Sequence, residues 1–189
     1  MKTSTRWYAI PALVMGAVLG TAIAAGAVAE HPDEYTGNMV NTVGGARFNQ
    51  PFVLSVDHYA DDADVRRLTG TLAAKGQYSL RDELWHERSA GYLRVGGRLG
   101  YPVAAVLSQQ TPNGRTLHVV LNRPLGAREV QYFTRSSKYP FTVLELSVDS
   151  NGKGEGRLLG AAKMQMHGDT LEFVSLGIQP VRLLAVRAD

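Results

Sequence analysis

Cysteine is absent from all 189 residues of this chain. Exported proteins often use disulfides, but a chain of this length can bury enough apolar surface to fold without them. The absence excludes thiol nucleophiles, thiolate zinc sites, iron–sulfur clusters and redox-active cysteine pairs. Any reaction chemistry would have to come from other side chains.

Motifs for nucleophilic catalysis or metal binding are also missing. There is no G-x-S-x-G sequence, and a serine–lysine motif starting at Ser136 or Ser137 would need its lysine where Tyr139 or Pro140 stands. The five histidines show none of the H-x-H, H-x-x-x-H or H-E-x-x-H spacings. We therefore predict no catalytic, metal or cofactor-binding residues. An enzyme hypothesis is left only if the strands of the fold bring His58 and His118 together beside Glu145.

A strong excess of one charge is lacking as well. The chain carries 20 basic and 17 acidic residues, and two of the basic ones, Lys2 and Arg6, precede a long uncharged segment. Removing that N-terminal segment leaves 18 basic against 17 acidic residues, a net charge near +1. This balance argues against a nucleic-acid partner, because such proteins carry a clear positive excess.

The first 29 residues have the pattern of a secretory signal peptide. Lys2 and Arg6 are followed by an uncharged run over Tyr8–Ala29, which ends in Ala27-Val28-Ala29 before Glu30. The run is long enough for a membrane anchor, but it is dominated by Ala and Gly, which favour cleavage over anchoring. We expect cleavage after Ala29, a periplasmic or extracellular location, and contact with the membrane only during export.

Apolar residues alternate through most of the remaining chain, as they do in half-buried strands. The expected strands are Tyr35–Val43, Phe52–Val56, Tyr92–Val95, Val103–Ser108, Leu117–Leu121, Glu129–Thr134, Leu144–Val148, Leu158–Met166, Leu171–Leu176 and Val181–Arg187. Turn residues such as Asn151-Gly152 separate them. Tyr35–Val43 and Arg182–Arg187 are expected at sheet edges, where charge discourages chance pairing.

Helical spacing is confined to one region after the second strand. Asp61 is a suitable N-cap, and Val65, Leu68 and Leu72 follow at helical intervals before Gly76. A second helix is expected to Arg88, with Leu80, Leu84 and Trp85 on one face.

Together these patterns predict an α+β fold that is predominantly antiparallel β, a sandwich or barrel-like sheet with a two-helix insertion and an N-terminal signal helix. Residues 1–29 are the signal peptide, 30–46 an extended lead-in with the first short strand, and 47–189 one β-rich domain with helices at about 61–88. If the sheet closes into a barrel, Leu158, Met164, Met166, Phe173 and Leu176 are apolar enough to line a ligand cavity, although a filled core uses the same residue types.

Basic and aromatic residues alternate between Arg123 and Phe141, against the single acid Glu129. Such a mixture suits anionic groups, sugars or a partner protein. The predicted contact residues are Arg123, Arg128, Tyr132, Arg135, Lys138 and Tyr139. The competing interpretation is a strand and turn whose aromatics fill the core while the arginines stay in solvent.

Three functions follow from the sequence. The favoured hypothesis is an exported, non-catalytic binding or interaction module without a cofactor, whose partner is a protein or a glycan. The alternative is a barrel-type carrier of a small lipophilic ligand. The third is a hydrolase or metal-dependent enzyme that uses the scattered histidines.

Overall fold

The computed structural model describes residues 33–41, 48–97, 99–125, 138–175 and 180–189. The predicted signal helix and the expected strand at 129–134 lie outside these residues. The elements are β1 (Asp33–Asn41), β2 (Phe48–Val56), α1 (Asp62–His86), β3 (Gly91–Val95), β4 (Tyr101–Val103), β5 (Ala105–Thr111), β6 (Gly114–Leu121), β7 (Phe141–Asp149), β8 (Lys153–His167), β9 (Thr170–Ser175) and β10 (Val181–Ala188). The other expected strands match this order, except that Val103–Ser108 spans a break.

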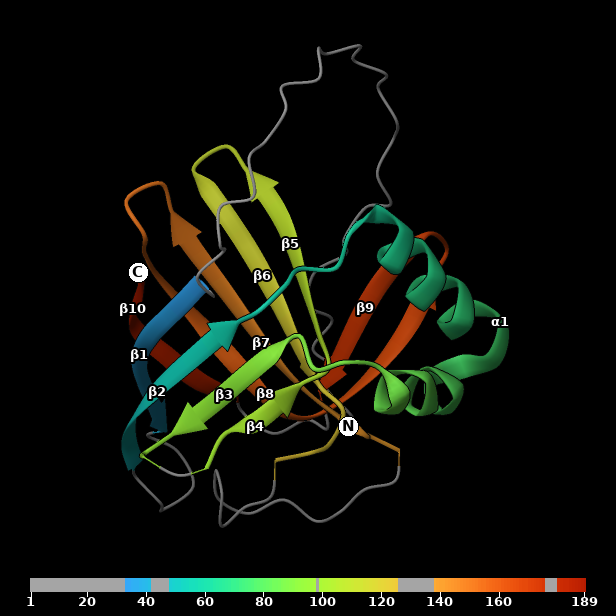
Figure 1. The fold of residues 1–189 in the computed structure, drawn as a ribbon, viewed down its shortest axis with the longest axis horizontal. Coiled ribbons are helices and arrows are strands. Elements are labelled where there is room, and N and C mark those ends of the chain that lie inside the picture. Colours follow the sequence, from blue (N-terminus) through green and yellow to red (C-terminus); the bar gives the residue numbers. More distant parts are fainter. Residues whose placement is uncertain (1–32, 42–47, 98, 126–137, 176–179) are drawn as a thin grey trace, which may run out of the picture.

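Nine of the strands form a nearly closed antiparallel barrel (Figure 1), in the order β4-β3-β2-β1-β10-β8-β7-β6-β5. The two ends of this order, β4 and β5, follow each other in sequence and are separated only by Ala104. β4 pairs with β3, and β5 pairs with β6. Ala104, which joins β4 to β5, donates its amide hydrogen to the Val120 carbonyl of β6. The segment from β4 to β5 is thus one strand broken at Ala104. One broken strand therefore brings the two ends of the sheet together.

The two strands expected at edges pair with each other. β1 pairs with both β2 and β10, and β10 pairs with both β1 and β8. The edge prediction was wrong because charged side chains on a strand, such as Arg182 and Arg187, also suit a central strand whose outer face is in solvent.

Helix α1 begins where the sequence predicted. The Asp61 carboxylate accepts a hydrogen bond from the Asp64 amide at 2.8 Å, as an N-cap does. The structure has one helical element instead of the two predicted, but its backbone is non-helical at Gly76 (φ 80°, ψ 178°). The break therefore falls at the glycine expected to end the first helix. No helix in the described part of the chain is both long enough and apolar enough to cross a bilayer.

The barrel interior is filled by apolar side chains. Tyr35, Leu54, Leu117, Leu144 and Leu183 are each fully buried there, and they come from five different strands. Leu158 contributes to this interior, as expected. Outside the barrel, α1 and β9 cover the strands from β5 to β8.

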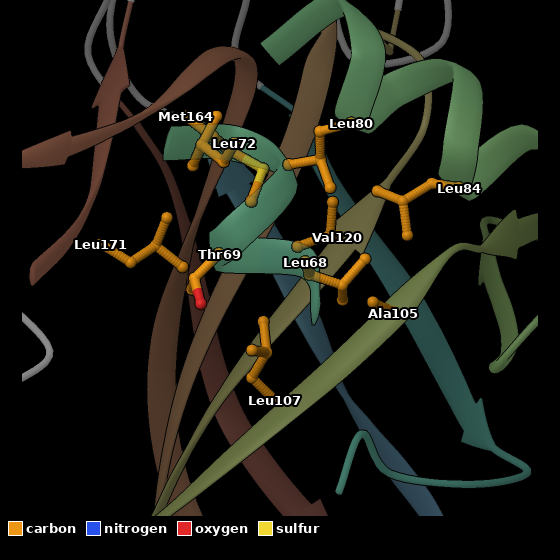
Figure 2. Close-up of a pocket in the computed structure, with 10 residues that line it drawn as sticks. All are labelled: Leu68, Thr69, Leu72, Leu80, Leu84, Ala105, Leu107, Val120, Met164 and Leu171. Carbon is orange, nitrogen blue, oxygen red and sulfur yellow. The ribbon is translucent and has the colours of Figure 1, made fainter. Parts of the chain in front are cut away.

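A second apolar cluster lies under this outer layer (Figure 2). Leu68, Leu72, Leu80 and Leu84 of α1 point toward Ala105, Leu107 and Val120 of the barrel. The cavity between them measures about 10 Å³, roughly the room that one water molecule needs. Met164 and Phe173, predicted to line a barrel interior, belong to this outer cluster, and Met166 packs against it, because β8 runs beyond the barrel to pair with β9 from Ala162 to His167. Leu176, predicted for the same interior, lies outside the described residues.

Candidate binding surface

The exposed side of α1 carries two large aromatic side chains. Trp85 is 68% exposed and Tyr78 is 51% exposed, whereas Leu80 and Leu84 are buried. The prediction that Trp85 shares a face with Leu84 was wrong, because consecutive helical residues are about 100° apart. Residues seven apart almost coincide in direction, so Tyr78 and Trp85 lie on one stripe with Arg81.

Two hydrogen bonds attach this helix to both flanks of the predicted arginine–aromatic segment. The Asn122 side-chain amide donates to the Arg81 carbonyl at 2.9 Å, and the Gln77 side-chain amide donates to the Lys138 carbonyl at 3.1 Å. These bonds hold Lys138 and the residue before Arg123 against α1 near Gln77 and Arg81, and both Arg123 and Lys138 are exposed. We call Tyr78, Arg81, Trp85, Arg123 and Lys138 the Trp85 surface.

The remaining predicted contact residues divide into two groups. Tyr139 is half-buried next to Lys138, and Arg128, Tyr132 and Arg135 lie outside the described residues.

The Arg123 guanidinium lies 5.1 Å from the centroid of the Tyr101 ring, a cation–π distance. The sequence missed Tyr78 and Trp85, although their spacing of seven residues on an amphipathic helix was a usable signal.

Arg67 neutralises three carboxylates on a different side of α1. It forms ion pairs with Asp64, Glu83 and Glu87. The hydrogen bond from Arg67 lowers the pKa of the Asp64 carboxyl, and the same partners raise the pKa of Arg67. Asp82, which Arg67 does not pair with, is exposed between Arg81 and Trp85. The three cations Arg81, Arg123 and Lys138 outnumber this carboxylate, so the Trp85 surface is net positive.

A buried ionic row crosses three strands on the outer face of the barrel. His118 of β6 is in register with Glu145 of β7, which is in register with Arg157 of β8. The Glu145 carboxylate accepts a hydrogen bond from Arg157, and its other oxygen lies 4.0 Å from His118 Nε2. Phe173 of β9 stacks on the imidazole with a centroid distance of 5.2 Å. Burial lowers the pKa of His118, against the opposing effect of Glu145.

A polar cluster lies where β1 and β6 begin. Tyr59 donates to the Asp33 carboxylate, and the Tyr35 and Tyr59 hydroxyls are 2.9 Å apart. Arg115 pairs with Asp33 at 3.3 Å and lies over both rings. Burial raises the pKa of the Tyr59 phenol well above its ordinary value. Because these groups bond each other, the cluster is best explained as a structural tie between β1, β6 and the segment after β2.

The histidine pair considered for catalysis is not assembled. His118 and Glu145 do come together, but His58 is exposed after the end of β2, outside the row. In the part of the chain that the structure describes, no three His, Asp or Glu side chains are grouped closely enough to hold a metal ion.

Comparison with protein-family models, with curated proteins and with solved structures finds no match for this chain. The roles assigned to its residues therefore rest on geometry and chemistry alone.

Proposed function

We propose that this chain is an exported, non-catalytic binding module that takes an anionic partner on the Trp85 surface. The observation that carries the proposal is Trp85 itself, 68% exposed on a helix whose leucines Leu68, Leu72, Leu80 and Leu84 are all buried. Exposed Trp and Arg are the residue types that most often dominate binding energy at interfaces. Three cations beside two aromatic rings favour a partner with carboxylate, sulfate or phosphate groups.

The carrier alternative receives less support from the described residues. The inward side chains of the barrel are fully buried against each other, and the cavity under α1 is far smaller than a ligand pocket of several hundred Å³. A lipophilic ligand would have to displace this packing. A surface contact needs no such rearrangement.

The binding experiment uses the tryptophan as its own reporter. The chain has two tryptophans, Trp7 and Trp85, so cleavage after Ala29 leaves Trp85 alone. Heparin and poly-glutamate serve as anionic probes, and neutral dextran is the control. We expect the Trp85 emission to change with an anionic probe and to recover at high salt, because exposed charge pairs are screened. Emission unchanged by both anionic probes would contradict the proposal.

Matched charge variants locate the contact. The triple variant Arg81→Ala, Arg123→Ala, Lys138→Ala should weaken probe binding about tenfold or more, the loss of roughly three exposed ion contacts. The control triple Lys153→Ala, Arg182→Ala, Arg187→Ala removes the same charge from exposed positions on β8 and β10. Equal weakening in both would indicate general charge attraction instead of a defined surface.

Export is tested separately by the intact mass of the protein purified from its native cells. A mass lacking residues 1–29 is the expected result. Retention of the full chain would make the segment a membrane anchor.

A further inference from the structure

His118 is held in an unusual position for a titratable group. Its side chain is 93% buried, and Nδ1 is buried without a hydrogen-bond partner. Phe173 lies on the face of its ring. Phe173 belongs to β9, the strand that pairs with β8 alone and lies outside the barrel order, beside α1 in Figure 1.

The groups around the imidazole cannot easily accept its protonated form. Glu145 of β7 faces it with one carboxylate oxygen at 4.0 Å, too far for a hydrogen bond, and the other oxygen is bound by Arg157 of β8. Arg157 adds a positive charge to the same row. From β9 the ring meets Phe173, and from β5 its register partner is the apolar Leu107.

We propose that His118 is a pH-sensitive latch, and that its protonation in mildly acidic conditions releases β9, together with the end of β8 that pairs with it, from the outer face of the barrel. A protonated imidazole has two N–H donors, and Nδ1–H would have no acceptor in the latched state. Water supplies that acceptor once Phe173 moves off the ring. The latch does not depend on the partner proposed above.

The direction of the pH effect follows from linkage. The pKa of His118 is lowered in the latched state, chiefly by burial, from its ordinary value of 6.5. Well above pH 6.5 the imidazole is neutral whether latched or open, so the latch is stable. As the pH falls below that value, only the open form takes up the proton. The ratio of open to latched protein then rises by up to about tenfold per pH unit, until the latched form protonates too.

The cysteine-free chain allows the opening to be measured by thiol labelling. Leu107→Cys places a thiol under the outer layer, and the adjacent exposed Ser108→Cys calibrates the intrinsic labelling rate at each pH. We expect the Leu107→Cys rate, relative to that reference, to rise several-fold for each pH unit below 6.5. A ratio that does not change with pH would overturn the latch.

Histidine variants assign the effect to one residue. His118→Phe keeps a ring against Phe173 and should abolish the rise, whereas His167→Phe, at an exposed position at the end of β8, should retain it. The same rise in His118→Phe would also overturn the latch. If that variant does not fold, the NMR titration of the unaltered protein decides the question. His118 must protonate below the ordinary histidine value of 6.5, and protonation at or above that value contradicts the proposal.

Discussion

The barrel has a covered half and an open half. In the covered half, β5 to β8, the outer layer of α1 and β9 buries the outward side chains, so that five consecutive residues of β6, Leu117–Leu121, are all buried. In the open half, β1 to β4 and β10, the outward side chains meet solvent, and β3 alternates strictly between buried and exposed.

The comparison explains two sequence patterns within one sheet. Tyr92 and Arg94 are exposed and Leu93 and Val95 are buried, the alternation expected of a sheet with one face in water. His118 and Val120 occupy the equivalent outward positions of β6 but are buried. A stretch of strand that is apolar at nearly every position, interrupted over Leu117–Leu121 of β6 only by His118, therefore marks the place where a second layer packs.

The largest expected effect is a difference in the free energy of unfolding between variants of the covered half and the open half. Phe141→Ala in the covered half removes a fully buried ring and should lower the free energy of unfolding by about 3–5 kcal/mol. Tyr92→Ala in the open half should change it by less than about 0.5 kcal/mol. Urea denaturation of both variants makes the measurement, and similar losses would show that the open half is also covered.

Adjacent helical residues give a sharper test of the outer layer. Leu84→Ala should cost about 2–3 kcal/mol, because its side chain is buried against the barrel. Trp85→Ala should leave the unfolding free energy, measured by urea denaturation, within about 0.5 kcal/mol. It should also weaken binding of the anionic probe, measured by titration calorimetry because this variant lacks the reporter tryptophan. A stability loss at Trp85 as large as that at Leu84 would remove the basis for the binding surface.

The smallest effect concerns two glycines of α1. Neither would bring an added Cβ within 4 Å of another atom, but Gly70 is helical and Gly76 has φ of 80°. Gly70→Ala should stabilise the protein by about 0.5–1 kcal/mol, and Gly76→Ala should destabilise it by about 1 kcal/mol, because an L-residue is strained there. Thermal unfolding checks the signs. Stabilisation by both would mean that the helix is continuous through Gly76.

Part of the candidate site was accessible from sequence and part was not. The alternation of cations and aromatics after Leu121 singled out Arg123 and Lys138 as candidates, because composition is visible in one segment; their role in binding stays a prediction. The attachment of that segment to α1 through Gln77 and Asn122 joins residues 41 to 61 positions apart in the chain, and no local pattern encodes such a contact. Trp85 was assigned to the wrong face because Leu84 and Trp85 are adjacent near the end of the helix. The apolar spacing there allows either residue to be the buried one.

Local chemistry thus determined the elements themselves: the strands of period two, the Asp61 cap, the break at Gly76 and the turn before Lys153. These depend on backbone propensity and on hydrogen bonds between near neighbours. Tertiary structure alone decided that β1 and β10 pair with each other, that β4 and β5 bring the two ends of the sheet together, and that His118 is buried under Phe173. An outward-facing side chain meets water or another layer according to where distant segments pack.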